Sequence, residues 1–177
     1  MWGDEMKDNM TIKGRVTVRT YDKSHEAEIQ RLFSLGYTAN QIAEMIPAAE
    51  TEVVENMVIT TGRQLIFRLL KGDTTVGLKY LAIGTNTTPP AMDDDWADVA
   101  ESFRKLITSF AFDNSSLYCD TFIATAEANF TWQEVVICGD STASGTAETG
   151  VIFSRALLNQ VKTDTQTKTV SWQYTLS

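Results

Sequence analysis

The side chains best able to do chemistry in this chain are one histidine and two cysteines. His25 is the only histidine in the sequence and lies among acidic and polar residues at an expected helix start. A Ser-His-Asp or Cys-His arrangement needs an oriented base, which an exposed His25 does not provide. Cys119 and Cys138 are too few and too far from His25 for zinc-site spacing. We therefore expect no enzyme activity, metal or cofactor, and reduced core thiols.

The densest group of carboxylates is Asp93, Asp94 and Asp95, followed by Asp98. Such a group offers the several oxygen ligands that a calcium ion prefers. Acids in a first helical turn also favour the helix dipole and cap free amides, and residues 96–103 have the pattern of a short helix. The sequence favours this helix start over a cation site.

Glu134 is a second carboxylate of interest, because it shares one side of a predicted strand with Trp132 and Val136. A carboxylate facing the core can be a catalytic acid, but its burial requires a partner such as Arg104 or Arg155. With no other catalytic group in view, we expect a structural ion pair or bonds to backbone amides.

Large aromatic residues fall within the predicted strands, where they are expected to form core rather than a sugar-binding platform. They are Trp132, Phe153, Trp172 and Tyr174. Binding of a surface glycan is therefore an open alternative that no exposed aromatic cluster in the sequence supports.

The elements that must position these groups are mostly strands. Residues 11–20 alternate apolar and polar side chains, and residues 53–59 are expected to return beside them. Further strands are predicted at about 104–112, 117–125, 131–138, 150–158 and 167–176, with a protruding mobile loop over 139–150. We predict a mainly β (α+β) fold: an antiparallel β-sandwich with one packed helix and an inserted N-terminal helical hairpin.

The inserted hairpin is predicted over residues 26–46, where two amphipathic helices flank Gly36. Thr38 and Gln41 form a capping-box pattern for the second helix, and Pro47 ends it. This is the layout of a helix-turn-helix unit, yet residues 38–46 contain no Lys or Arg and the net charge is -8. A surface of this sign repels phosphates, so we expect no nucleic acid partner and an apolar hairpin edge facing a neighbouring subunit or its own sheet.

A distinctive order of elements runs from residue 60 to residue 90. Thr60 or Thr61 is expected to cap a helix with an apolar face, and Lys71 and Gly72 to end it. A short buried strand over 78–83 then leads into the loop Gly-Thr-Asn-Thr-Thr-Pro-Pro, residues 84–90. The apolar positions of the helix are Leu65, Ile66, Leu69 and Leu70.

This order resembles the tail-collar fibre family of bacteriophages and related small phage structural proteins. The resemblance covers about residues 56–177 and includes the acidic segment before Arg104-Lys105, the turn 127–129 before Trp132-Gln133-Glu134, and a last strand over 167–174. Asn86 stands where that family commonly has glycine, and residues 136–138 replace its Gly-Leu-Phe.

The resemblance implies a bacteriophage virion structural protein, acting as a fibre-base or adaptor module in the tail or baseplate. A capsid decoration (cement) protein is the main alternative, followed by a receptor-binding tip and a DNA-binding regulator. It also implies partners: further copies of itself, with trimers common where fibres attach, and other virion proteins. The expected location is the virion, after assembly in the bacterial host cytoplasm.

The predicted division of the chain is residues 1–59, an N-terminal arm with strands and the helical hairpin, and residues 60–177, a tail-collar-like β-sandwich domain. We expect no membrane partner, because no apolar run approaches the roughly 20 residues of a membrane span. The start of the chain also shows no apolar core of a secretory signal.

Overall fold

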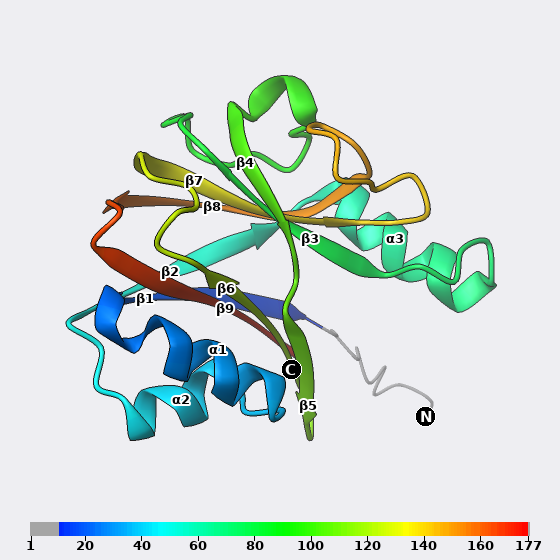
Figure 1. Cartoon of the computed structure of the whole chain (residues 1–177). Coiled ribbons are helices and arrows are strands. Elements are labelled where there is room, and N and C mark those ends of the chain that lie inside the picture. Colours follow the sequence, from blue (N-terminus) through cyan, green and yellow to red (C-terminus); the bar gives the residue numbers. More distant parts are fainter. Residues whose placement is uncertain (1–10, 177) are drawn as a thin grey trace, which may run out of the picture.

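The computed structural model describes residues 11–176, and the predicted N-terminal arm before them lies outside this range. Within it, nine antiparallel strands form one sheet in the order β4-β3-β7-β8-β2-β1-β9-β6-β5 (Figure 1). The strands are β1 Ile12–Asp22, β2 Glu50–Val58, β3 Leu78–Gly84, β4 Glu101–Leu106, β5 Ser109–Asp113, β6 Ser116–Ile123, β7 Thr131–Gly139, β8 Val151–Val161 and β9 Gln166–Leu176. The predicted β-rich class and the pairing of β1 with β2 are confirmed.

The sheet curls into a half-barrel with two halves that face each other. The β1 half contains β2, β1, β9, β6 and β5, and the β7 half contains β4, β3, β7 and β8. The halves are joined by only two residue pairs between β2 and β8, Met57 with Arg155 and Val58 with Ser154. The predicted β-sandwich is therefore not confirmed as two separate sheets, because hydrogen bonding continues from one half into the other.

On the other side, the chain itself passes from one half to the other between β4 and β5. The Ile107 amide donates to the Lys79 carbonyl in the β7 half, and the Thr108 amide donates to the Asp120 carbonyl in the β1 half. The single strand predicted over 104–112 is thus wrong. A change of hydrogen-bonding partner at residues 107 and 108 divides it into β4 and β5.

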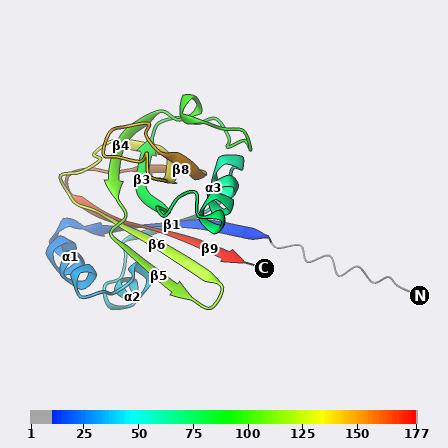
Figure 2. The ribbon, with the colours of Figure 1, turned by 90° about the vertical axis from the view of Figure 1, so that its right-hand side faces the viewer.

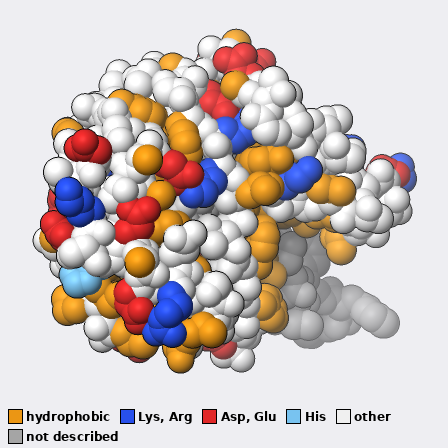
Figure 3. Space-filling view, in the orientation of Figure 1, with side chains coloured by type: hydrophobic (Ala, Val, Ile, Leu, Met, Phe, Trp, Pro, Cys, Tyr) orange, Lys and Arg blue, Asp and Glu red, His pale blue; other side chains and the backbone are white. Residues whose placement is uncertain are grey.

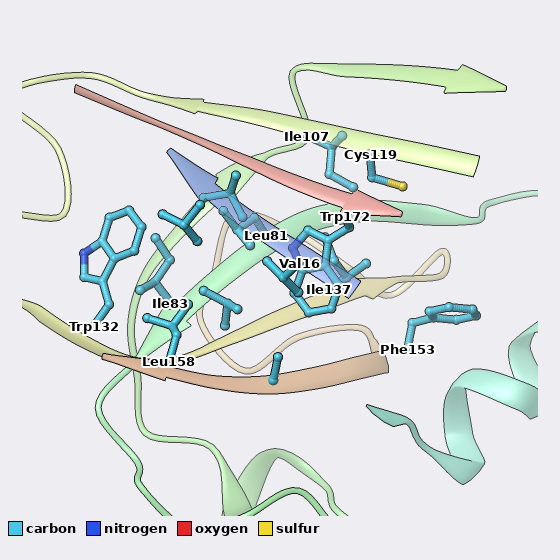
Figure 4. Close-up of a cluster of buried hydrophobic side chains, with 14 of the residues drawn as sticks. Val16, Leu81, Ile83, Ile107, Cys119, Trp132, Ile137, Phe153, Leu158 and Trp172 are labelled. Carbon is cyan, nitrogen blue, oxygen red and sulfur yellow. The ribbon is translucent and has the colours of Figure 1, made fainter. Parts of the chain in front are cut away.

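The main core fills the space between the two halves. Val16 and Trp172 come from the β1 half, and Leu81, Ile137 and Leu158 come from the β7 half (Figure 4). The predicted aromatic core residues Trp132, Phe153, Trp172 and Tyr174 all belong to this cluster. Inward-facing residues of both halves are large and apolar, so burial of this surface drives the curling.

Helices α1 Glu26–Ser34 and α2 Ala39–Met45 lie between β1 and β2 in the chain. They pack on the outer surface of the β1 half, with Ile29, Phe33 and Ile42 joining Tyr21 and Phe122 of the sheet in a second apolar cluster. The capping box predicted at the start of α2 is present. The second cluster shares no buried residue with the main core, so the two helices cover the sheet without entering the barrel.

Helix α3 Thr60–Lys71 packs against β8 and ends at Gly72, which has the left-handed backbone expected of a C-terminal cap. Its N-cap is Ile59 and not the predicted Thr60 or Thr61; the Thr61 hydroxyl donates to the Ile152 carbonyl instead. A Cβ on Gly62 would lie 2.1 Å from the Phe153 carbonyl oxygen, so glycine is required for this close approach. None of the helices in residues 11–176 is long and apolar enough to cross a membrane.

Candidate functional site

The side chains singled out from the sequence meet around the loop that follows β3. Glu134 on β7 and Arg155 on β8 are fully buried, and Asp94 lies nearly buried in the segment before β4. We call these three side chains the loop clamp. They hold residues 84–100, which contain the Gly-Thr-Asn-Thr-Thr-Pro-Pro sequence.

Arg155 is the centre of the loop clamp. Its Nε donates to Glu134 Oε2 over 2.8 Å, its Nη1 donates to Asp94 Oδ2 over 2.8 Å, and its Nη2 donates to the Thr88 carbonyl over 3.0 Å. Burial alone would lower the pKa of Arg155, but the hydrogen bonds with Asp94 and Glu134 outweigh burial and raise it. The guanidinium is therefore a permanent positive charge shared by two carboxylates and one loop carbonyl.

Glu134 binds the loop directly through its second oxygen. Its Oε1 accepts hydrogen bonds from the Ala100 amide over 2.8 Å and the Asn86 amide over 3.1 Å. A Cβ at Gly84 would lie only 2.4 Å from this oxygen, so the first residue of the loop must be glycine for the carboxylate to reach both amides. The predicted structural role of Glu134 matches this geometry, with Arg155 as its partner and not Arg104.

Asn86, the third residue of the loop, bonds across it. Its Nδ2 donates to the Asp98 carbonyl over 2.6 Å, and its Oδ1 accepts from the Thr88 amide over 2.8 Å. An asparagine side chain here therefore adds two bonds that glycine lacks.

Three of the four acidic residues considered as calcium ligands are engaged within the chain, and Asp93 is exposed. Asp94 accepts from Arg155 and from the Ala91 amide, while Asp95 and Asp98 form a capping box around the short 3-10 helix Trp96–Asp98. The helix predicted over 96–103 is wrong beyond this single turn, because β4 begins at Glu101. Among residues 11–176, no group of three His, Cys, Asp or Glu side chains is arranged to hold a metal ion.

Arg104 forms a second buried ion pair beside the loop clamp. Its Nε donates to Glu101 Oε1 over 2.7 Å, and its guanidinium lies 5.0 Å from the Trp96 ring. Its Nη1 donates to the Ser144 and Thr149 carbonyls, which fastens the loop predicted over 139–150 to the sheet. Trp96 Nε1 adds a bond to the Gly150 carbonyl, so both long loops are anchored at the same end of the β7 half.

The remaining chemical candidates lie apart from these pairs. His25 is exposed in a short 3-10 turn before α1, on the outer side of the β1 half. Cys119 and Cys138 are fully buried free thiols on β6 and β7, as predicted. Burial raises the pKa of Cys138 to about 12, which keeps this thiol protonated and unreactive at neutral pH.

Four buried charged residues were not predicted from the sequence: Asp120, Asp140, Lys162 and Lys168. Lys168 on β9 is fully buried; it donates to Thr20 Oγ1 and Gln160 Oε1, and burial lowers its pKa to about 8. Asp120 on β6 accepts from the Ala39 amide at the start of α2 over 2.7 Å and from Ser171. Lys168, Val170 and Trp172 are alternate residues of β9, so their side chains point to the same, inward face of the sheet. This alternation is the sequence signal that could have predicted the burial of Lys168.

The arrangement around residues 84–150 fixes two long loops to the β7 half. Both oxygens of Glu134 accept bonds from within the chain. On the face drawn in Figure 3, acidic and basic side chains are interspersed without a broad basic patch. No protein-family model matches the chain, and no curated protein or solved structure shows significant similarity to it.

Proposed function

We propose that this chain is a structural protein of a bacteriophage particle, acting as a fibre-base or adaptor module in the tail or baseplate, without enzymatic activity. The proposal rests on the resemblance of residues 56–177 to the tail-collar fibre family. Its role is to bind copies of itself and other virion proteins, and its location is the virion.

The observation that carries the proposal is the convergence of the resembling segments in one buried network. The loop 84–90, the acidic segment and the Trp-x-Glu strand are far apart in sequence, yet Arg155 or Glu134 bonds to each of them. The residues that carry the resemblance to the tail-collar fibre family hold a loop in place here, which supports a structural role. Acid–base catalysis by Glu134 would instead require a carboxylate oxygen left open to a substrate.

An apolar surface on α3 that residues 11–176 leave exposed gives a second line of support. Of the predicted apolar face, only Leu65 is buried; Leu69 is 37% exposed and Leu70 is 78% exposed. They line a groove of about 480 Å³ whose other walls are Leu78, Phe112, Leu117 and Tyr174. Contiguous exposed apolar surface of this kind marks a contact site more often than a free surface.

We also propose the finer architecture that the sequence predicts. The two facing halves of the sheet share one core and serve as the two layers of a sandwich, and α1 with α2 forms an inserted hairpin that has its own apolar cluster. Ala49 donates its amide to the Thr20 carbonyl directly below the insertion. The β1–β2 pair therefore closes without help from the hairpin.

Labelling of intact particles tests the proposed function. An antibody raised against the purified chain is applied to particles from the phage that encodes it, with electron microscopy as the readout. Label on the tail or baseplate supports the proposal, and label over the head would instead support the capsid decoration alternative. Purified particles that lack the chain by both label and mass spectrometry would overturn a virion role.

A further inference from the structure

Strand β5 leaves one edge of the sheet uncovered. It is the last strand in the sheet order, and among residues 11–176 it pairs only with β6 (Figure 2). An edge strand presents a row of unpaired backbone amides and carbonyls, which natural proteins commonly protect with lysine, proline or a bulge. The sequence Ser-Phe-Ala-Phe-Asp of β5 has no lysine or proline, and its five residues pair with β6 without a register shift.

Two phenyl rings on β5 are also uncovered. Phe110 is 52% exposed and Phe112 is 74% exposed. They lie opposite Cys119 and Leu117 of β6, so their side chains share the face of the sheet that carries the core. The apolar face of the sheet therefore extends from β6 onto β5, where no element of the described chain covers it.

The three central residues of β5, Phe-Ala-Phe, are symmetric about Ala111. If β5 of one copy pairs antiparallel with β5 of another copy about Ala111, each Phe110 faces Phe112 of the second copy, and each Ser109 faces Asp113 of the second copy. Directly opposed aromatic side chains stabilise antiparallel pairs. This register places no two like charges opposite each other.

We propose that the chain forms a two-fold dimer in which β5 of one copy adds to β5 of a second copy and continues the sheet across the interface. This inference rests on the proposed assembly function and names a copy of the same chain as the partner at this edge. A two-fold contact is self-complementary, which the palindromic Phe-Ala-Phe sequence satisfies. Backbone bonds supply affinity, and the phenyl rings supply register.

The expected dimer is weak. Each phenylalanine offers roughly 150–250 Å² when fully buried, so the exposed parts of four rings amount to about 400–600 Å². Stable interfaces bury about 1,000 Å² or more, and the strand backbones must supply the remainder. Each copy carries a net charge of -8, so added salt should strengthen association by screening the repulsion between copies.

The first test is the mass of the purified chain in solution, measured by sedimentation equilibrium over protein and salt concentration. We expect a monomer–dimer equilibrium that shifts toward dimer at higher salt. Ala111→Lys places two lysines opposite each other on the two-fold axis and should weaken dimerisation at least tenfold. Circular dichroism and the thermal midpoint serve as controls that this variant is folded.

The second test fixes the register. Ala111→Cys should form a disulfide-linked dimer on oxidation, because the proposed pairing puts residue 111 opposite itself at a distance that a disulfide can span. Ser34→Cys, at an exposed position on α1, is the matched control and should not crosslink. The natural cysteines are fully buried and do not compete.

A wild-type chain that stays monomeric at every concentration would overturn the dimer. A trimer or other oligomer that ignores Ala111→Lys, with no crosslink through Ala111→Cys, would also overturn it by showing that another surface associates. These results are independent of particle labelling. A β5 dimer without the chain in virions would refute the proposed function alone, whereas a monomeric chain found in virions would refute this inference alone.

Discussion

Replacing Glu134 by glutamine is the most direct perturbation of the loop clamp. The carboxylate accepts three hydrogen bonds, from Arg155 Nε and from the Asn86 and Ala100 amides. A glutamine amide has one accepting oxygen and one donating NH₂ group. Whichever way it turns, its NH₂ group faces at least one of these donors, and Arg155 loses one of its two charged partners.

The magnitude follows from the burial of the pair. Both Glu134 and Arg155 have 0% exposed side chains. Removing one partner from a buried ion pair costs about 3–5 kcal/mol when the remaining charge is left uncompensated, and Arg155, which keeps Asp94, should fall in the lower part of this range. That loss lowers the folding equilibrium constant by roughly 100- to 3,000-fold, at about 1.4 kcal/mol per factor of ten. For a chain of this size it should lower the thermal midpoint by about 6–20 °C.

The assay is chemical denaturation with a matched exposed pair as control. Glu28→Gln makes the same change in the pair that Glu28 forms with Arg31 on α1, where both side chains are about half exposed. We expect no measurable change in midpoint for Glu28→Gln. If Glu134→Gln shifts the midpoint no more than Glu28→Gln does, the loop clamp does not stabilise the fold and our reasoning about it fails.

Three further changes give separate checks. Gly62→Ala should destabilise the fold by about 1–3 kcal/mol through overpacking, although alanine usually stabilises a helix relative to glycine. Gly145→Ala is the control: it has open space around it and should leave the thermal midpoint unchanged. Asp120→Asn can keep both bonds and should be mild, whereas Asp120→Ala leaves the Ala39 amide unpaired at about 1–3 kcal/mol and should speed hydrogen exchange in α2. Burial lowers the pKa of Lys168 to about 8, below about 10.4 in the unfolded chain, so the folded state loses this proton first and stability should rise between these pH values. Lys168→Met should remove that rise in urea midpoints measured from pH 7 to 10.

The elements predicted correctly are those whose signals are local. Thr38 and Gln41 specify the start of α2 by bonds between residues three apart, and the Lys71-Gly72 end of α3 is equally local. The alternation in β1 and the chain's return in β2 needed only the period of a strand. These patterns are encoded within a few residues, so a single sequence contains them.

The errors concern hydrogen bonds between distant residues. The propensities of residues 104–112 suit one long strand, and only the bonds of Ile107 to Lys79 and of Thr108 to Asp120 divide it. The continuity of the two halves rests on two residue pairs between β2 and β8. No local pattern distinguishes such a curled sheet from two stacked sheets.

Only part of the loop clamp could be predicted, because the choice of ion-pair partner also depends on distant residues. Alternation predicted that Glu134 is buried, but it wrongly placed Glu134 on the same side of β7 as Trp132. A β-bulge between Trp132 and Glu134 turns Glu134 to the face of Val136, away from the main core. Both Arg104 and Arg155 were acceptable partners. The choice depends on register: Arg155 lies opposite Val136, two residues along β7 from Glu134, while Arg104 lies on β4 opposite Ala82. Strand register depends on contacts across the whole sheet. The sequence of one strand therefore does not specify which residues of a neighbouring strand lie opposite it.

The distribution of buried and exposed groups supports an assembly role more than the resemblance alone does. The charged side chains of Arg155 and Arg104 are buried and hold loops, while phenylalanine and leucine side chains remain exposed on β5 and α3. Phe112 belongs to both exposed surfaces, since it lies on the β5 edge and lines the α3 groove. A second copy added at β5 would therefore also cover one wall of the groove, which joins the two apolar surfaces into a single contact region.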